Sequence, residues 1–94
     1  MDITQARKIA LDYIEKNIVP PEGDQYLIVD SAVKEVDIGW FFPFQTNRFI
    51  ETNDIEYSVV GNWPILVTRN GIVHGPTRPE YYDRSTAEAP DINL

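Results

Sequence analysis

The chain has 94 residues, of which 43% are hydrophobic, 12% aromatic and 24% charged. This composition is typical of one globular domain and excludes a disordered chain. The absence of Cys excludes disulfides, thiolate zinc sites and Cys nucleophiles. Because no continuous apolar run opens the sequence, we expect a soluble, cytoplasmic protein with neither a signal peptide nor a membrane span.

The net charge of -7 is concentrated in the middle of the chain. Residues 22–56 hold eight acids against Lys34 and Arg48, a local balance of -6. Such a field repels phosphate backbones and anionic lipids and attracts basic protein surfaces. We therefore expect no direct nucleic-acid or membrane partner, although an acidic surface also simply keeps a protein soluble.

The first expected element is an amphipathic helix over residues 3–17. Asp2 and Gln5 stand at the spacing of a capping box. Apolar residues recur at helical spacing on one face: Ile3, Ala6, Ile9, Ala10, Tyr13 and Ile14. Pro20 and Pro21 cannot continue the helix. Since only one face is apolar, the helix is expected to cover a sheet.

Two strands are expected next, over residues 26–33 and 39–45, with residues 34–38 as the turn region or the distal end of a long hairpin. In the second strand the alternation places three aromatic residues on one face and two residues on the other: Trp40, Phe42 and Phe44 against Phe41 and Pro43. Pro43 donates no backbone hydrogen bond, which predicts a sheet edge or a bulge there.

A short helix is then predicted over about residues 54–60. Asn53 and Glu56 have capping-box spacing, Asp54 falls in the first turn, and Gly61 suits a C-terminal cap.

A hairpin follows, and it is the strongest local signal in the chain. Residues 64–69 form the first strand, Asn70-Gly71 predicts a type I′ turn, and residues 72–74 return. We expect the side chain of Asn62 to cap the turn beside it.

The end of the chain is expected to add little structure. Thr77 and Glu80 predict a last helical turn over residues 79–84, and residues 85–94 are expected to be a flexible tail. The prediction is thus one domain, residues 1–84, of the α+β class. It has an N-terminal helix packed on an antiparallel sheet of about four strands, and a short helix inserted between strands two and three. The sheet face away from the helix is expected to be wet.

Catalytic signals are weak. His74 is the single imidazole, at the end of a hairpin strand where a solvated side chain is the ordinary outcome, and no His or Cys spacing suits a metal. The glycines are isolated, and Ser31, Ser58 and Ser85 lack a nucleophile-elbow context. We therefore expect no enzyme, cofactor or metal.

The two tryptophans are treated separately. Trp40 lies within an apolar run and is expected in the core. Trp63 precedes Pro64 at a strand entrance, so it is either a structural lid or a contact residue.

Two stretches, GWFFPFQTNRFIE and GNWPILVTRNGIVHGPTRPEYY, resemble the immunity protein 35 family, also called the YrhB-like domain, over about residues 3–83. The shared pattern is a Gly-Trp-aromatic strand, then Gly-Asn-x-Pro, an apolar strand, a residue-Gly turn and a Gly-Thr-x-Pro-like segment before Tyr. The matching positions are Gly39, Trp40, Phe42, Phe44, Gly61, Asn62, Pro64, Gly71, Gly75, Thr77 and Pro79. Pro76 departs from the pattern by standing between Gly75 and Thr77.

The resemblance implies a non-catalytic protein that neutralises a secreted bacterial toxin by binding it, without a cofactor. Together with the acidic middle segment, it leads us to expect a basic toxin domain as partner and a monomer or weak dimer. The expected toxin-binding residues are Glu35, Asp37, Glu51, Asp54, Glu56 and Trp63.

Two alternatives stay open. One is a chaperone-like holdase that uses an exposed apolar sheet face around Phe41 or Tyr26. The other is a small enzyme or ligand-binding fold with a pocket between helix and sheet.

Overall fold

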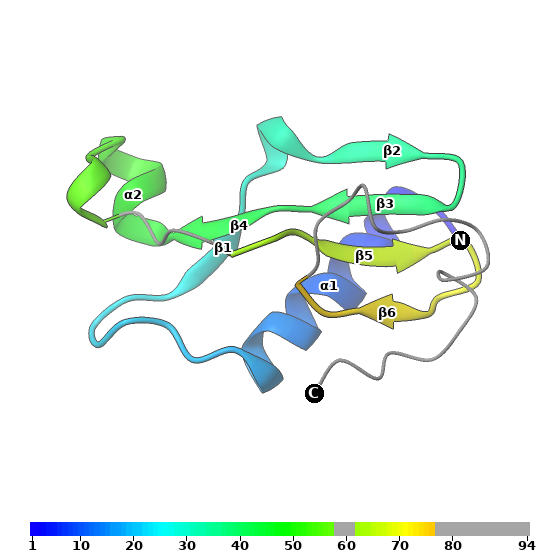
Figure 1. Cartoon of the computed structure of the whole chain (residues 1–94), viewed down its shortest axis with the longest axis horizontal. Coiled ribbons are helices and arrows are strands. Elements are labelled where there is room, and N and C mark those ends of the chain that lie inside the picture. Colours follow the sequence, from blue (N-terminus) through cyan, green and yellow to red (C-terminus); the bar gives the residue numbers. More distant parts are fainter. Residues whose placement is uncertain (58–61, 77–94) are drawn as a thin grey trace.

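A computed structural model describes residues 1–57 and 62–76. The main sheet is antiparallel, with its strands in the order β2 (Lys34–Val36), β3 (Gly39–Phe42), β5 (Ile65–Thr68) and β6 (Val73–His74) (Figure 1). A second antiparallel pair consists of β1 (Tyr26–Ile28) and β4 (Phe44–Thr46). The helices are α1 (Ile3–Asn17) and α2 (Asn47–Thr52), with 3-10 turns η1 (Asp30–Ala32) and η2 (Ile55–Tyr57). The predicted α+β class is confirmed.

Helix α1 begins and ends where the sequence predicts. The Asp2 Oδ1 atom accepts a hydrogen bond from the Gln5 backbone N at 2.9 Å, and the Gln5 side chain accepts one from the Asp2 backbone N at 3.0 Å. This capping box satisfies two N–H groups that have no partner within the helix. Ala6, Ala10 and Ile14 form the buried stripe, and the two alanines let the helix lie close across the sheet, chiefly on β5.

Pro43 divides the predicted strand 39–45 into β3 and β4. Phe42 pairs with Ile65 in the main sheet, whereas Phe44 pairs with Ile28 of β1. Between them the Pro43 carbonyl accepts a hydrogen bond from the Val29 backbone N at 2.8 Å. An edge or a bulge is expected at Pro43; the structure has a full break there, where the chain passes from one sheet to the other.

The predicted alternation of faces is also confirmed. Trp40, Phe42 and Phe44 belong to the main core beneath α1, whereas Phe41 packs with Leu66 on the opposite face. That second face was expected to be wet, and at these positions it is not, since Phe41 is 5% exposed and Leu66 is 0% exposed.

The strand predicted over residues 26–33 is too long. β1 stops at Ile28, and the chain turns through η1, where Asp30 is held by Arg7 in an ion pair of 2.8 Å. Asp, Ser and Ala are poorer strand formers than the residues before them. Residues 34–36, expected in a turn or at the end of a hairpin, form β2, and the turn itself is confined to residues 37–38.

The second helix lies earlier than predicted. α2 begins after Thr46, whose hydroxyl accepts a hydrogen bond from the Phe49 backbone N at 3.2 Å. Asn53 ends this helix in the left-handed conformation, φ 57°, so it does not begin one. Of the predicted range 54–60, residues 55–57 form η2, and residues 58–60 with Gly61 lie outside the described residues.

The β5–β6 hairpin is confirmed, but its turn is not type I′. Gly71 has a positive φ of 86°, whereas Asn70 does not. The Gly71 backbone N donates to the Thr68 carbonyl at 3.0 Å, and the Thr68 N donates to the Ile72 carbonyl at 2.9 Å. This is the arrangement of a longer loop with one left-handed glycine and a bulge. The Thr68 hydroxyl favours it by bonding the Asn70 side chain and the Ile72 backbone N. The predicted turn over 79–84 and the tail 85–94 lie outside the described residues.

Candidate interaction surface

The predicted acidic contact residues fall into two groups at opposite ends of the long axis of the molecule. Glu35 lies in β2 and Asp37 in the β2–β3 turn, at the right of Figure 1. Glu51 lies in α2, Asp54 follows it, and Glu56 lies in η2, at the left of the same view. The acids therefore do not form one continuous face.

The hairpin end, which comprises β2, the β2–β3 turn and the Arg69 side chain beside them, is electrically balanced. Arg69 Nη1 lies 2.8 Å from Glu35 Oε2, and Arg69 Nη2 donates to the Val36 carbonyl at 2.8 Å. The same guanidinium stacks on the Trp40 ring, 4.5 Å from its centroid. Lys34 lies on the opposite face of β2, with Phe41; counted with it, residues 34–37 and Arg69 hold two bases and two acids, so this end carries no formal excess.

The α2 end has an excess of negative charge. Its base, Arg48, pairs with Asp24 and lies 4.7 Å from the Tyr57 ring centroid. Arg48 Nε donates a hydrogen bond to Asp24 Oδ1, and this bond raises the pKa of Arg48. Within the described part of the chain, Glu51, Asp54 and Glu56 form no ion pair.

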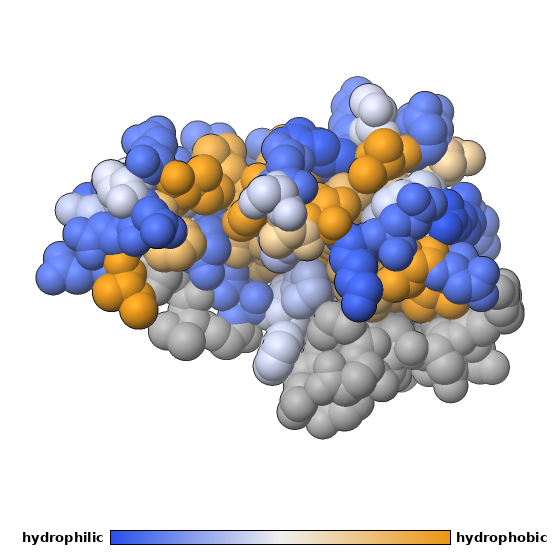
Figure 2. Space-filling model, turned by 90° about the horizontal axis from the view of Figure 1, so that it is seen from above, coloured by the Kyte–Doolittle hydropathy of each residue, from blue (hydrophilic) through white to orange (hydrophobic). Residues whose placement is uncertain are grey.

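Apolar side chains are exposed among these acids. Ile55 is 80% exposed and Ile50 is 40% exposed. Figure 2 shows hydrophobic residues at the surface among hydrophilic ones over the end that α2 occupies, at the left. We name Ile50, Glu51, Asp54, Ile55 and Glu56 the α2 surface.

Trp63 lies next to the strand that leads into α2. The neighbouring Asn62 side chain donates to the Phe44 carbonyl and is 3.5 Å from the Gln45 amide, so it reaches β4 instead of capping its own turn as expected. Trp63 is 43% exposed. Trp40, by contrast, is in the core as predicted.

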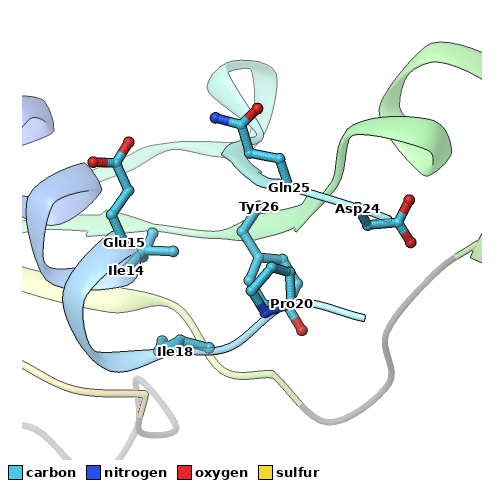
Figure 3. Close-up of a pocket in the computed structure, with 7 residues that line it drawn as sticks. All are labelled: Ile14, Glu15, Ile18, Pro20, Asp24, Gln25 and Tyr26. Carbon is cyan, nitrogen blue, oxygen red and sulfur yellow. The ribbon is translucent and has the colours of Figure 1, made fainter. Parts of the chain in front are cut away.

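The expected pocket between helix and sheet is only a shallow hollow. It has a volume of about 160 Å³ and is lined by Ile14, Glu15, Ile18, Pro20, Asp24, Gln25 and Tyr26. Figure 3 shows Glu15, Asp24 and Gln25 pointing in different directions, with no common point of convergence. Burial, and then the charge of Asp24, raises the pKa of Tyr26 above its ordinary value. The hollow lacks the converging polar groups of a catalytic or ligand site.

A second hollow of about 290 Å³ lies where β3 leaves the main sheet. Its lining residues are Ala32, Lys34, Phe41, Pro43 and Pro64, which offer one charged group and otherwise apolar surface. Phe41 and Tyr26, the centres of the holdase alternative, are both buried.

His74 is buried, with 3% exposure, so the expectation of a solvated side chain is wrong. It stands opposite Leu66 in the hairpin and therefore shares the covered face of the sheet. Across residues 1–57 and 62–76 no three His, Cys, Asp or Glu side chains gather as a metal site would require. In the same ranges no helix combines the length and apolar character needed to span a membrane.

Comparison with known proteins places these features in a family. Neither the curated proteins nor the solved structures gave a match. The family model described as Immunity protein 35 matches residues 4–79, from the first turn of α1 past the β5–β6 hairpin. This range covers most of the chain, and the protein belongs to the immunity protein 35 family.

Proposed function

We propose that this protein neutralises a bacterial protein toxin by binding to it, without catalysis or a cofactor, in the cytoplasm of the cell that makes the toxin. The observation that carries the proposal is the family match over residues 4–79. Two features of the chain support it. The described hollows hold no converging catalytic groups, and the formal charge of -7 suits a basic partner.

The acidic side chains and the exposed tryptophan would make different contributions. Carboxylates at the surface accelerate encounter with a basic protein at low ionic strength, and this effect weakens as salt is added. An exposed aromatic ring that becomes buried in a complex slows dissociation. The candidate contact residues are the acids of two separate groups, Glu35 with Asp37 and Glu51 with Asp54 and Glu56, together with Trp63, in a monomer or weak dimer.

The proposal is tested by protection of cells. The toxin domain encoded beside this gene is expressed under tight control, with and without this protein. We expect growth to be restored when both are present, and the purified pair to associate more slowly as salt is raised from about 0.05 to 0.5 M. Continued killing by the toxin in cells that hold the folded protein would contradict the proposal.

A further inference from the structure

We infer that the toxin docks on the α2 surface together with Trp63, and that the hairpin end is not part of the contact. The partner would carry Lys and Arg side chains around an apolar hollow that receives Ile55. The inference rests on the proposed function and specifies which of the two acidic groups acts in it.

Charge separates the two ends. At the hairpin end Glu35 is already bound by Arg69, so a basic partner would have to displace an internal cation whose guanidinium also bonds the Val36 carbonyl. At the α2 end, Asp24, Glu51, Asp54 and Glu56 stand against Arg48, an excess of three negative charges. Uncompensated charge attracts a basic partner, whereas a neutral pair exerts little field beyond a Debye length.

Exposed apolar groups coincide with that excess. Ile55 stands between Asp54 and Glu56, and Ile50 stands beside Glu51. Among the described residues the other large apolar side chains with high exposure are Trp63, beside β4, and Met1, Ile3 and Val19, at the ends of α1. An apolar centre with a charged rim is the anatomy of a protein interface, in which the rim guides encounter and the centre gives affinity.

The α2 surface is also held in a fixed shape. The Thr46 hydroxyl caps α2 and donates to the Tyr57 carbonyl, which ties the start of the helix to the end of η2. Arg48 stacks on Tyr57, and the Asp54 carboxylate accepts a hydrogen bond from the Glu56 backbone N at 3.0 Å. Because these contacts order the segment before binding, less conformational entropy is lost on association.

The test compares matched variants at separate places on the molecule. The first variant of the α2 surface is Glu51→Lys with Glu56→Lys, which reverses two charges. Its control, Asp12→Lys with Asp37→Lys, makes the same change in total charge elsewhere on the molecule. The second variant of the α2 surface, Ile55→Ser, removes an exposed apolar group. Its control is Val19→Ser, because Val19 is even more exposed, at 89%. The probe is the toxin domain encoded beside this gene, inactivated in its own active site, and each Kd is measured by calorimetry on samples whose folding is checked by circular dichroism.

We expect both variants of the α2 surface to bind the toxin domain at least about tenfold more weakly than the unmodified protein. The Kd of each control should stay within about twofold of the unmodified value. Equal binding by all variants, or weakening confined to the Asp12 and Asp37 control, would overturn the inference and leave toxin binding intact. Absence of binding by the unmodified protein would instead refute the proposed function. Trp63→Ala and Ile55→Ala provide a milder second pair should a charge-reversed variant fail to fold.

Discussion

Both ends of this molecule carry acidic residues, two at the hairpin end and four at the α2 end, and the ends differ in how these acids are paired. At the hairpin end Arg69 bonds Glu35 and covers Trp40, so charge and aromatic surface are both used within the fold. At the α2 end Arg48 forms its ion pair with Asp24, three further carboxylates have no ion pair within the described residues, and the Ile55 side chain is exposed. The comparison teaches that the number of acids alone does not mark a candidate binding surface. A carboxylate paired within the fold attracts a basic partner less than an unpaired one does.

The largest effect is expected at the hairpin end, from Gly39→Ala. Gly39 has a φ of 155°, and a Cβ atom there would lie 2.1 Å from the Val67 carbonyl oxygen. Backbone strain and overlap with β5 together should cost about 3 kcal/mol or more. Urea unfolding measures the loss.

Gly23→Ala is the control for that experiment. Gly23 also has a positive φ, 82°, but nothing lies within 4 Å of the added Cβ atom. Strain alone should cost about 1 kcal/mol. Equal losses for the two variants would show that the close approach of β3 and β5 is not what requires Gly39.

A smaller loss is expected at the α2 end, from Thr46→Val. The substitution keeps the shape of a fully buried side chain but removes the cap of α2 and the hydrogen bond to Tyr57. We expect destabilisation of about 2 kcal/mol, together with weaker toxin binding because the α2 surface loses its support.

Thr52→Val is the matched control, since both hydrogen bonds of the Thr52 hydroxyl are exposed to water: it donates to the Arg48 carbonyl and accepts from the Asp54 backbone N at 3.2 Å. It should change stability by about 0.5 kcal/mol or less. If the affinity for the toxin domain is unchanged by Thr46→Val, the proposed binding surface does not depend on α2.

Arg69→Gln tests the claim that the hairpin end is balanced. The exposed ion pair and the stacking on Trp40 should contribute about 1 kcal/mol or less to the free energy of unfolding. Toxin affinity should stay within about twofold. A large gain in affinity on freeing Glu35 would contradict the assignment, since it would show that this end faces the partner.

The smallest effect appears only at alkaline pH and involves Tyr26. Its folded-state pKa is raised above 10.0 by burial and by Asp24, so the unfolded chain loses the phenol proton first. The stability from this group is therefore present below the unfolded-state pKa and is lost as pH rises through the folded-state pKa. Thermal unfolding between about pH 8 and 11 should show a shallower decline for Tyr26→Phe than for the unmodified protein. Parallel declines would exclude Tyr26 as the source.

Local signals in the sequence were reliable where one residue controls one local geometry. The Asp2 and Gln5 side chains set the start of α1, and Pro43 set the break between two sheets. α2 was missed because Thr46, a good strand former, ends β4 and caps the helix at the same time, whereas the Asn53–Glu56 spacing imitates a capping box.

The candidate surface was only partly predictable. The acids and Trp63 can be named from the sequence. The Arg69–Glu35 ion pair, which distinguishes the acids of the hairpin end from those of the α2 end, joins residues 34 positions apart and depends on the register of the sheet. Burial of His74 likewise follows from its place opposite Leu66, which the sequence does not reveal.

The most direct test of the central claim is amide hydrogen exchange on the complex with the toxin domain. Binding through the α2 surface should slow exchange across residues 47–57 and at Trp63, and leave the β2–β3 turn at residues 37–38 unchanged. Slower exchange confined to the β2–β3 turn, with none across α2 and η2, would contradict it.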